Sequence, residues 1–356
     1  MRAIIMRGGN LQMIEAEDPV PGPGQLLVAP IFNGICGSDL HRREQMRLEG
    51  ESYDGDTGDL PAIIPGHEFS AEVISIGPEN STDIRPGDRV VALPFSPDPS
   101  GEGFINVGLS TARSGGLATR CLIDSARTFK IPDNVPSDVA ALTEPLSVGW
   151  HAALLADRNA GPNLILGAGP IGLAVLIALQ EMGRGPNICV DFSSVRREKA
   201  QEFGADLVID PKATSPYDFW HGYDFVPSSA SPLALRRFEG RPRGLNIFEC
   251  TGSPVILAEI IAHAPQHSHV IYAGVCKHEV RHVPVHAILK ELAIDYCFAY
   301  TPKEFETVLN LISNKPEYFR KMITNQFPLE NTEMAFDCLS GSAREVKIMI
   351  EVQNSP

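Results

Sequence analysis

The sequence lacks the features of disulfide-rich, membrane-spanning and secreted proteins. Its seven cysteines are odd in number, scattered and without a CxxC pair, which argues against a disulfide framework. No apolar run is long enough to span a membrane, and the apolar run near the N-terminus is too short for a signal peptide. We therefore expect a protein of the reducing cytoplasm that has no membrane partner.

An excess of positive charge is also absent. The formal net charge is -14 at pH 7, so the chain repels phosphate backbones, and we expect no nucleic-acid partner. The composition, 43% hydrophobic and 21% charged, is ordinary for a globular protein. At about 150 residues per domain, a chain of 356 residues predicts two domains.

The N-terminal part predicts short strands, turns and two long loops. Apolar runs at Ala3–Met6, Gln25–Pro30 and Phe69–Ile76 indicate strands, and the Pro/Gly-rich stretches between them indicate turns. Residues 42–59 are polar, acidic and contain several glycines, whereas residues 94–116 are rich in Pro, Gly and Ser. We expect both segments to be loops, the first of them exposed near the mouth of a site.

The second half of the chain alternates strands with helices. Helical patterns come first, interrupted by Glu144-Pro145, and an alternating series follows. The expected helices are 139–142, 146–155, 171–182 and 194–203, and the expected strands are 163–166, 187–190 and 207–210. This alternation predicts an α/β fold with a doubly wound parallel sheet.

The stretch Gly167-Ala168-Gly169-Pro170-Ile171-Gly172 matches GxGxxG and lies between an expected strand and an expected helix. In such loops the first glycine allows a tight turn, the second lets a pyrophosphate approach the backbone, and the third lets helix and strand pack closely. The helix N-terminus then offers free N–H groups to the phosphates. We therefore predict that Gly167, Gly169, Pro170, Ile171 and Gly172 bind a dinucleotide.

An acidic residue indicates which dinucleotide binds. The next expected strand ends at Asp191, 19 residues after Gly172 (191 − 172). A carboxylate there accepts hydrogen bonds from the ribose hydroxyls of NAD and repels the extra phosphate of NADP. Arg196, which we count among the cofactor-binding residues, and Arg197 are close by and leave NADP open as an alternative.

Cys36, His67 and Glu68 form a candidate metal site, because thiolate, imidazole and carboxylate all bind zinc. Adjacent side chains of a strand point to opposite faces, so His67 and Glu68 can share a metal only where the backbone bends. Gly66 allows such a bend. The alternative is that the three side chains lie apart and bind no metal. The nucleotide motif downstream argues against this alternative, because a bound dinucleotide implies a reaction in which a metal can take part.

In combination, these motifs resemble the zinc-dependent medium-chain dehydrogenases, in particular the branch of alcohol, sorbitol, threonine and glucose dehydrogenases. The resemblance covers nearly the whole chain. It implies a GroES-like β-rich catalytic domain, residues 1–157 and 295–356, and a Rossmann NAD-binding domain, residues 158–294. The matching segments are GICGSDLH from Gly34, PGHE from Pro65, RPGDRVV from Arg85, TEPLSVGWHA from Thr143, GAGPIG from Gly167, ECTGSP from Glu249 and AYTPKEFETVLNLI from Ala299.

The resemblance also implies roles for residues of the metal site. Cys36, His67 and Glu68 would bind zinc, and Glu144 would be a mobile or water-bridged fourth ligand. Asp39 would accept a hydrogen bond from the other ring nitrogen of His67 and fix its tautomer. Zinc with three protein ligands leaves a position for the substrate oxygen and lowers the pKa of the alcohol.

Ser38 and His41 resemble the relay that carries the alcohol proton to solvent. We therefore predict a zinc-dependent oxidoreductase that transfers a hydride between an alcohol, expected to be a secondary alcohol or a polyol, and NAD. One alternative is an NAD(P)-dependent aldose dehydrogenase that uses the same zinc and hydrogen bonds from residues 42–59. The other is a non-catalytic protein that binds a nucleotide.

The segment 94–116 departs from the family pattern. Many members bind a second, structural zinc through four closely spaced cysteines in this lobe, whereas residues 94–116 contain no cysteine. The prediction is therefore one catalytic zinc and no structural zinc. Because this lobe often contacts a neighbouring subunit in relatives, its departure bears on the oligomeric state, for which we expect a homodimer or homotetramer.

The remaining thiols and imidazoles are expected to have no chemical role. Six cysteines lie in apolar contexts and are predicted to be core residues. Six histidines between residues 263 and 286 have irregular spacing in the Rossmann half, and we expect them at the surface or at an interface.

Overall fold

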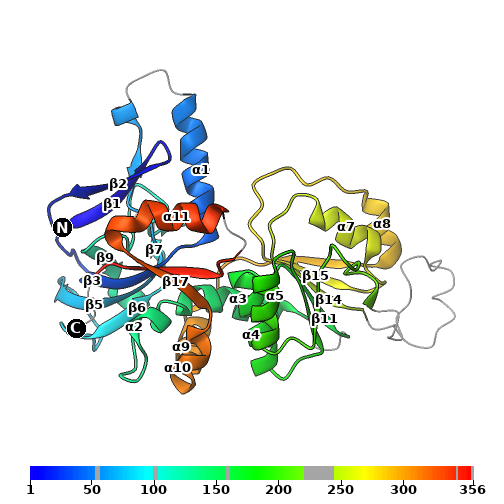
Figure 1. Cartoon of the computed structure of the whole chain (residues 1–356). Coiled ribbons are helices and arrows are strands. Elements are labelled where there is room, and N and C mark those ends of the chain that lie inside the picture. The colour runs from blue at the N-terminus through cyan, green and yellow to red at the C-terminus, as the bar shows by residue number, and fades with distance from the viewer. Residues whose placement is uncertain (53–56, 99–102, 158–160, 220–243, 342–343, 354–356) are drawn as a thin grey trace. The chain divides into compact units, whose positions relative to one another are not determined.

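The computed structural model describes residues 1–52, 57–98, 103–157, 161–219, 244–341 and 344–353. The chain forms two compact units, each of which is described by itself (Figure 1). Unit 1 comprises residues 1–144 and 301–356, and unit 2 comprises residues 145–300. The expected domain limits, 1–157 with 295–356 and 158–294, stay a prediction.

Unit 1 is organised around the long strand β3 (Gln25–Gly34), which is buried over nearly its whole length. It pairs antiparallel with β5 (Glu68–Ile76), β9 (Cys121–Asp124) and β18 (Lys347–Glu351). The order of this sheet is β10-β6-β5-β3-β18-β17, with β9 also beside β3. The C-terminal strand β18 therefore completes the same sheet as the N-terminal strands.

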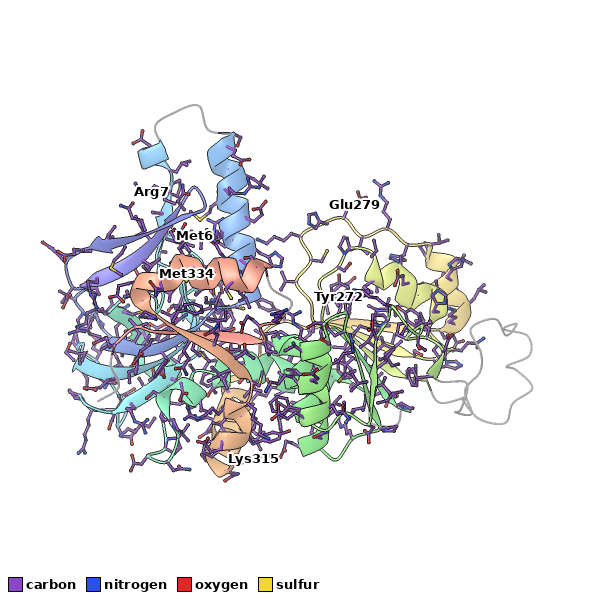
Figure 2. All side chains as sticks on the ribbon, in the orientation of Figure 1. Met6, Arg7, Tyr272, Glu279, Lys315 and Met334 are labelled. Carbon is purple, nitrogen blue, oxygen red and sulfur yellow. The ribbon has the colours of Figure 1, made fainter. Side chains whose placement is uncertain are left out.

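The other elements of unit 1 cover this sheet and add a smaller one, β2-β1-β4. Met6 of β1 is buried in the core, whereas Met334 on helix α11 is exposed (Figure 2). The remaining strands are β1 (Arg2–Arg7), β2 (Asn10–Glu15), β4 (Ala62–Ile63), β6 (Arg89–Ala92), β10 (Thr128–Lys130) and β17 (Ile323–Pro328). The helices are α1 (Gly37–Glu51), α2 (Ser137–Ala140), α9 (Pro302–Asn314), α10 (Pro316–Arg320) and α11 (Thr332–Gly341). The 3-10 turns are η1 (Thr57–Asp59), η2 (Ser125–Arg127) and η4 (Leu329–Asn331).

Helix α1 (Gly37–Glu51) shows that the loop expected over residues 42–59 was wrong in its first part. At the start of the helix, the Asp39 carboxylate accepts a hydrogen bond from the Cys36 N–H at 3.0 Å. On the exposed face, Arg47 pairs with Glu44, three residues before it, and with Glu51, four residues after it. These local pairs favour a helix in spite of the polar composition.

Tertiary contacts also hold α1 in place. Arg43 donates hydrogen bonds to Asp337 of α11 at 2.6 Å and to the carbonyl of Gly9 in the β1–β2 turn at 3.0 Å. Its guanidinium also lies 5.9 Å from the centre of the Phe336 ring. Two of these three partners come from the far end of the chain, so the helix depends on contacts that local sequence patterns do not contain.

The segment 94–116 contains a short hairpin where we expected an irregular loop. Its strands are β7 (Phe95–Pro97) and β8 (Phe104–Asn106). The residues between these strands fall partly outside the described part of the chain. Beyond β8 the segment has no regular structure and runs along residues 64–66.

Unit 2 contains a six-stranded parallel sheet of order β13-β12-β11-β14-β15-β16. Numbered along the chain this order is 3-2-1-4-5-6, that of the doubly wound dinucleotide-binding fold, which confirms the expected fold class. Helices α4 and α5 pack against β11, β12 and β13, and α7 and α8 lie together (Figure 1). No helix among the described residues combines the length and the apolar character needed to cross a membrane.

The elements of unit 2 agree closely with the expected ones, with one exception. We expected Glu144-Pro145 to interrupt the helical pattern, but both residues lie in the first turn of helix α3, where a proline removes no hydrogen bond. The strands are β11 (Asn163–Leu166), β12 (Asn187–Val190), β13 (Leu207–Ile209), β14 (Asn246–Glu249), β15 (His269–Tyr272) and β16 (Ala293–Tyr296). The helices are α3 (Thr143–Leu155), α4 (Pro170–Glu181), α5 (Ser194–Glu202), α7 (Ile256–His263) and α8 (Pro284–Lys290).

A ladder of buried amides sets the register at the start of the central strands. Asn163 of β11 donates to Asn187 of β12 at 2.8 Å, and Asn246 of β14 donates to Asn163 at 2.9 Å. Asn246 also exchanges hydrogen bonds with the backbone of Asp157. Because buried amides need partners, this ladder favours the register that places the loops after β11, β12 and β14 together at the opposite edge.

Candidate active site

Cys36, His67 and Glu68 lie together in unit 1. Their ligand atoms, a thiol sulfur, a ring nitrogen and a carboxylate oxygen, are all within 4.8 Å of one another. Cys36 directly precedes α1, and Gly66, with φ of +99°, turns the chain just before His67 and the start of β5. The expected bend at Gly66 is therefore present, and no second group of this kind occurs among the residues that the structure describes.

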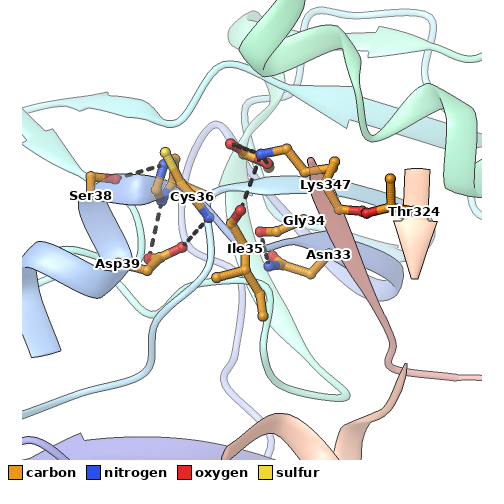
Figure 3. A network of polar contacts seen from close by, with 10 residues as sticks. Asn33, Gly34, Ile35, Cys36, Ser38, Asp39, Thr324 and Lys347 are labelled. Carbon is orange, nitrogen blue, oxygen red and sulfur yellow. Dashed lines mark hydrogen bonds and ion pairs between the residues drawn. The ribbon is translucent and has the colours of Figure 1, made fainter. Parts of the chain in front are cut away.

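His67 has a polar neighbour at each ring nitrogen. Its Nε2 lies 3.3 Å from Ser38 Oγ, and its Nδ1 lies 3.5 Å from Asp39 Oδ1. Burial opposes a charge on the ring, but the carboxylate of Asp39 and the thiol of Cys36 outweigh burial and raise the pKa of His67 well above its ordinary value. Asp39 also accepts the Cys36 N–H, so one carboxylate contacts both candidate ligands (Figure 3).

Glu68 is paired with Lys347, a residue that the sequence analysis missed. The Lys347 ammonium lies 2.6 and 2.8 Å from the two carboxylate oxygens and donates to the Ile35 carbonyl at 3.1 Å (Figure 3). The two side chains are only 1% and 0% exposed. Burial opposes the ammonium charge, but Glu68 and Cys36 raise the pKa of Lys347 above its ordinary value. The signal in the sequence was a lone lysine in the apolar stretch VKIMI.

Glu144 and His41 lie outside the close group. Glu144 is buried in the first turn of α3, near enough to Lys347 to interact with its charge. His41 is exposed on α1, three residues after Ser38. Their roles as fourth ligand and proton relay stay predictions.

The predicted nucleotide loop joins β11 to α4. Gly167 has φ of +94°, and a Cβ on Gly172 would lie 1.8 Å from the carbonyl oxygen of Gly167, so both positions require glycine. A Cβ on Gly169 would meet only the Arg196 guanidinium, at 3.8 Å. The space above Gly169 is therefore open beside a cation, as a pyrophosphate requires, and Pro170 begins α4 directly after it.

Asp191 is held between this loop and helix α5. Its carboxylate accepts hydrogen bonds from the Ala168 N–H at 2.9 Å and the Ser193 N–H at 2.8 Å. Arg197 donates to the Asp191 carbonyl at 2.8 Å and pairs with Asp210 at 2.9 Å. The guanidinium of Arg197 is thus engaged by two oxygens of the protein.

Glu249 is a second residue to which sequence reasoning assigned no role. It is fully buried at the end of β14, where it accepts hydrogen bonds from the N–H groups of Thr251 at 2.7 Å and Gly252 at 3.0 Å. Burial raises the pKa of Glu249 above its ordinary value. A Cβ on Gly167 would lie 2.9 Å from the Thr251 side chain, so this loop meets the nucleotide loop where the strand order reverses.

The other thiols and imidazoles form no comparable group in the described ranges. All seven cysteines are free, and of the six expected in the core only Cys121 and Cys189 are buried, whereas the other four are partly exposed. Burial raises the pKa of Cys121 to about 12. His267 pairs with Glu291 at 3.3 Å, and His269 pairs with Asp295 at 2.9 Å. These contacts give two of the six histidines a carboxylate neighbour.

Two protein families match this sequence. The Alcohol dehydrogenase GroES-like domain matches residues 22–133, which lie in unit 1. The Zinc-binding dehydrogenase family matches residues 170–314, which begin at the first residue of α4 and include most of unit 2. The two matches follow each other in the order that the sequence motifs indicated.

Similar proteins match over nearly the whole chain. Bovine (Bos taurus) sorbitol dehydrogenase is 30% identical over 98% of this chain and 95% of its own. Human (Homo sapiens) sorbitol dehydrogenase is 29% identical over 99% of this chain and 96% of its own. The crystal structure of 2R,3R-butanediol dehydrogenase from Bacillus subtilis has a TM-score of 0.76 and 25% identity, with 99% of both chains covered. The protein therefore belongs to the zinc-dependent medium-chain dehydrogenase family.

Proposed function

We propose that this protein is a zinc- and NAD-dependent dehydrogenase of secondary alcohols or polyols. The observation that carries the proposal is the meeting of one thiol, one imidazole and one carboxylate within 4.8 Å. The relatives support the substrate class, because they are sorbitol dehydrogenases and a butanediol dehydrogenase. We also propose that the protein is cytoplasmic and forms a homodimer or homotetramer. The exposed apolar side chains of Ile288, Tyr296 and Phe298 support the association between subunits.

The donor atoms fit zinc. Zinc accepts sulfur, imidazole and carboxylate ligands, and catalytic sites have three protein ligands and one open position. Cys36, His67 and Glu68 would hold the ion, with Glu144 as the mobile fourth ligand and no structural zinc elsewhere. Bound there, zinc would act as a Lewis acid on the substrate oxygen.

The residues around the ligands would orient them and move the proton. Asp39 faces Nδ1 of His67 and leaves Nε2 for the metal. The Ser38 hydroxyl lies beside Nε2, where it would accept the proton of the substrate alcohol. His41 lies three residues further along the exposed side of α1, so it would pass the proton to solvent.

The nucleotide loop would hold NAD. Gly167, Gly169 and Gly172 would let the pyrophosphate approach the start of α4, with Arg196 beside it. The Asp191 carboxylate is oriented by two backbone N–H groups, and it would accept hydrogen bonds from the adenosine ribose. The same charge would repel the phosphate that NADP carries at this position.

A substrate panel tests the proposed function. NADH formation by the zinc-loaded protein would be followed with secondary alcohols, polyols and aldoses, each with NAD and with NADP. Turnover of polyols or secondary alcohols with NAD is the expected result. Turnover confined to aldoses would favour an aldose dehydrogenase, and a complete lack of turnover with bound zinc would favour a protein that only binds a nucleotide.

Replacing Asp191 with serine is expected to lower kcat/KM for NAD by about 10- to 100-fold and to reduce the preference over NADP. Hydrogen bonds to a charged group are worth about 1.5–3 kcal/mol, and each 1.36 kcal/mol is about tenfold in rate. Steady-state kinetics with both cofactors measure the effect. Asp218→Ser, which removes a carboxylate from an exposed residue of unit 2, is the matched control. Equal kinetics in the two variants would contradict the assignment.

A further inference from the structure

The segment 107–117 contacts the backbone directly before His67. The N–H groups of residues 115, 116 and 117 donate to the carbonyls of residues 64, 66 and 65, at 2.8, 2.9 and 3.0 Å. Three successive donors therefore meet three successive acceptors. The Gly66 carbonyl belongs to the peptide bond that joins Gly66 to His67, so the peptide directly before His67 is one of these acceptors.

The contact is so close that only glycines fit. A Cβ on Gly115 would lie 2.2 Å from the Gly66 oxygen and 2.4 Å from the Pro65 oxygen. A Cβ on Gly108 would lie 2.3 Å from the same Gly66 oxygen. Real Cβ atoms essentially never approach backbone atoms at such distances, so a side chain at either position would push the Gly66–His67 peptide away. The Gly66 carbonyl is thus contacted from two points of one segment.

Asn33 supports the same peptide from another direction. A Cβ on Gly66 and a Cβ on Gly116 would each lie 2.5 Å from the Asn33 Oδ1 atom. The Asn33 side chain is fully buried and donates to the Gly34 carbonyl at 2.7 Å. Because Gly66 also has φ of +99°, both its conformation and its surroundings exclude a side chain.

The segment is itself anchored to the sheets of unit 1. The Leu117 carbonyl accepts the Ile4 N–H of β1 at 2.9 Å, and Leu117 is fully buried. Nearby, the buried thiol of Cys121 donates to the Ser114 carbonyl at 3.2 Å. The contact with residues 64–66 is therefore made by a fixed part of the unit and not by a free loop end.

We propose that Gly108, Gly115 and Gly116, together the glycine clamp, are positioning residues that hold His67 in the geometry for zinc binding. This inference rests on the proposed function, since it assumes that His67 is a zinc ligand. It assigns a role to a lobe that contains no cysteine between residues 94 and 116.

Gly115→Ala tests the clamp, because Gly115 has an ordinary φ and the added methyl group acts through steric contact alone. Zinc affinity would be measured by competition with a chromogenic chelator, with circular dichroism and NADH binding as checks on the fold. We expect zinc affinity to fall about 10- to 100-fold, while NADH binding by unit 2 and the circular dichroism spectrum stay as in the parent. Gly103→Ala is the matched control in the same lobe, since its Cβ would meet nothing within 4 Å.

A second variant covers the case in which Gly115→Ala does not fold. Cys121→Ala removes the hydrogen bond to Ser114 without adding atoms, and we expect a several-fold loss of zinc affinity. Parental zinc affinity in folded Gly115→Ala, or in Cys121→Ala where Gly115→Ala does not fold, would overturn the inference. A parent protein without zinc affinity would instead overturn the proposed function, so the two failures are distinguishable.

Discussion

Cys36→Ser is expected to abolish zinc binding and to lower kcat/KM for the best alcohol about a thousandfold. A Lewis acid at the substrate oxygen is worth several kcal/mol, and each 1.36 kcal/mol is about tenfold in rate. Cys36 supplies the single sulfur of the ligand group, and a neutral serine hydroxyl does not replace a thiolate. Elemental analysis and steady-state kinetics on the same samples measure both effects.

Cys338→Ser is the control for this experiment, because its thiol lies on α11 outside the ligand group. The parent and the control are expected to hold about one zinc per chain, since the sequence supplies one set of ligands for a catalytic site. Two zinc ions per chain in the parent would contradict the predicted absence of a structural zinc. Unchanged turnover in Cys36→Ser would refute the metal site itself.

Lys347→Met is expected to lower the free energy of unfolding of the zinc-free protein by about 3–5 kcal/mol. Glu68 is fully buried, and both of its carboxylate oxygens are within 2.8 Å of the Lys347 ammonium. Methionine fills a similar volume but leaves the carboxylate without its cation. Urea denaturation, followed by fluorescence, measures the difference in stability.

Three further variants separate the charge effect from packing. Lys347→Arg keeps the positive charge and is expected to lose less stability than Lys347→Met. The double variant Glu68→Gln/Lys347→Met removes both charges, so it is expected to be more stable than Lys347→Met alone. Glu68→Gln alone completes the cycle. If its loss of stability and that of Lys347→Met simply added in the double variant, the pair would not be coupled as the structure indicates.

Much of unit 2 could be predicted from local sequence. The strands at 163–166 and 187–190 have the bounds that their apolar runs predicted. Strands buried on both faces need continuous apolar stretches, and a tight phosphate loop needs glycines. Both features can therefore be recognised from a short stretch of sequence. The same holds for the bend at Gly66, because a φ of +99° favours glycine.

Helix α1 could not be predicted in the same way. Its composition is polar and includes glycine, and the contacts of Arg43 with α11 come from residues near 335. Such long-range contacts can stabilise a helix whose local pattern is weak. The sequence therefore indicated the chemistry of Cys36, Ser38 and Asp39 but not the helix that begins directly after Cys36.

By itself the sequence determined the fold class and indicated the candidate nucleotide loop and the candidate zinc ligands, because each needs particular residue types in short motifs. Only the tertiary structure revealed Lys347 beside Glu68, 279 residues away, and the glycine clamp beside the peptide before His67. A buried charge pair and a close backbone contact join segments that are far apart in the chain. Their energies depend on distance in space, so no pattern within one segment identifies the partner segment.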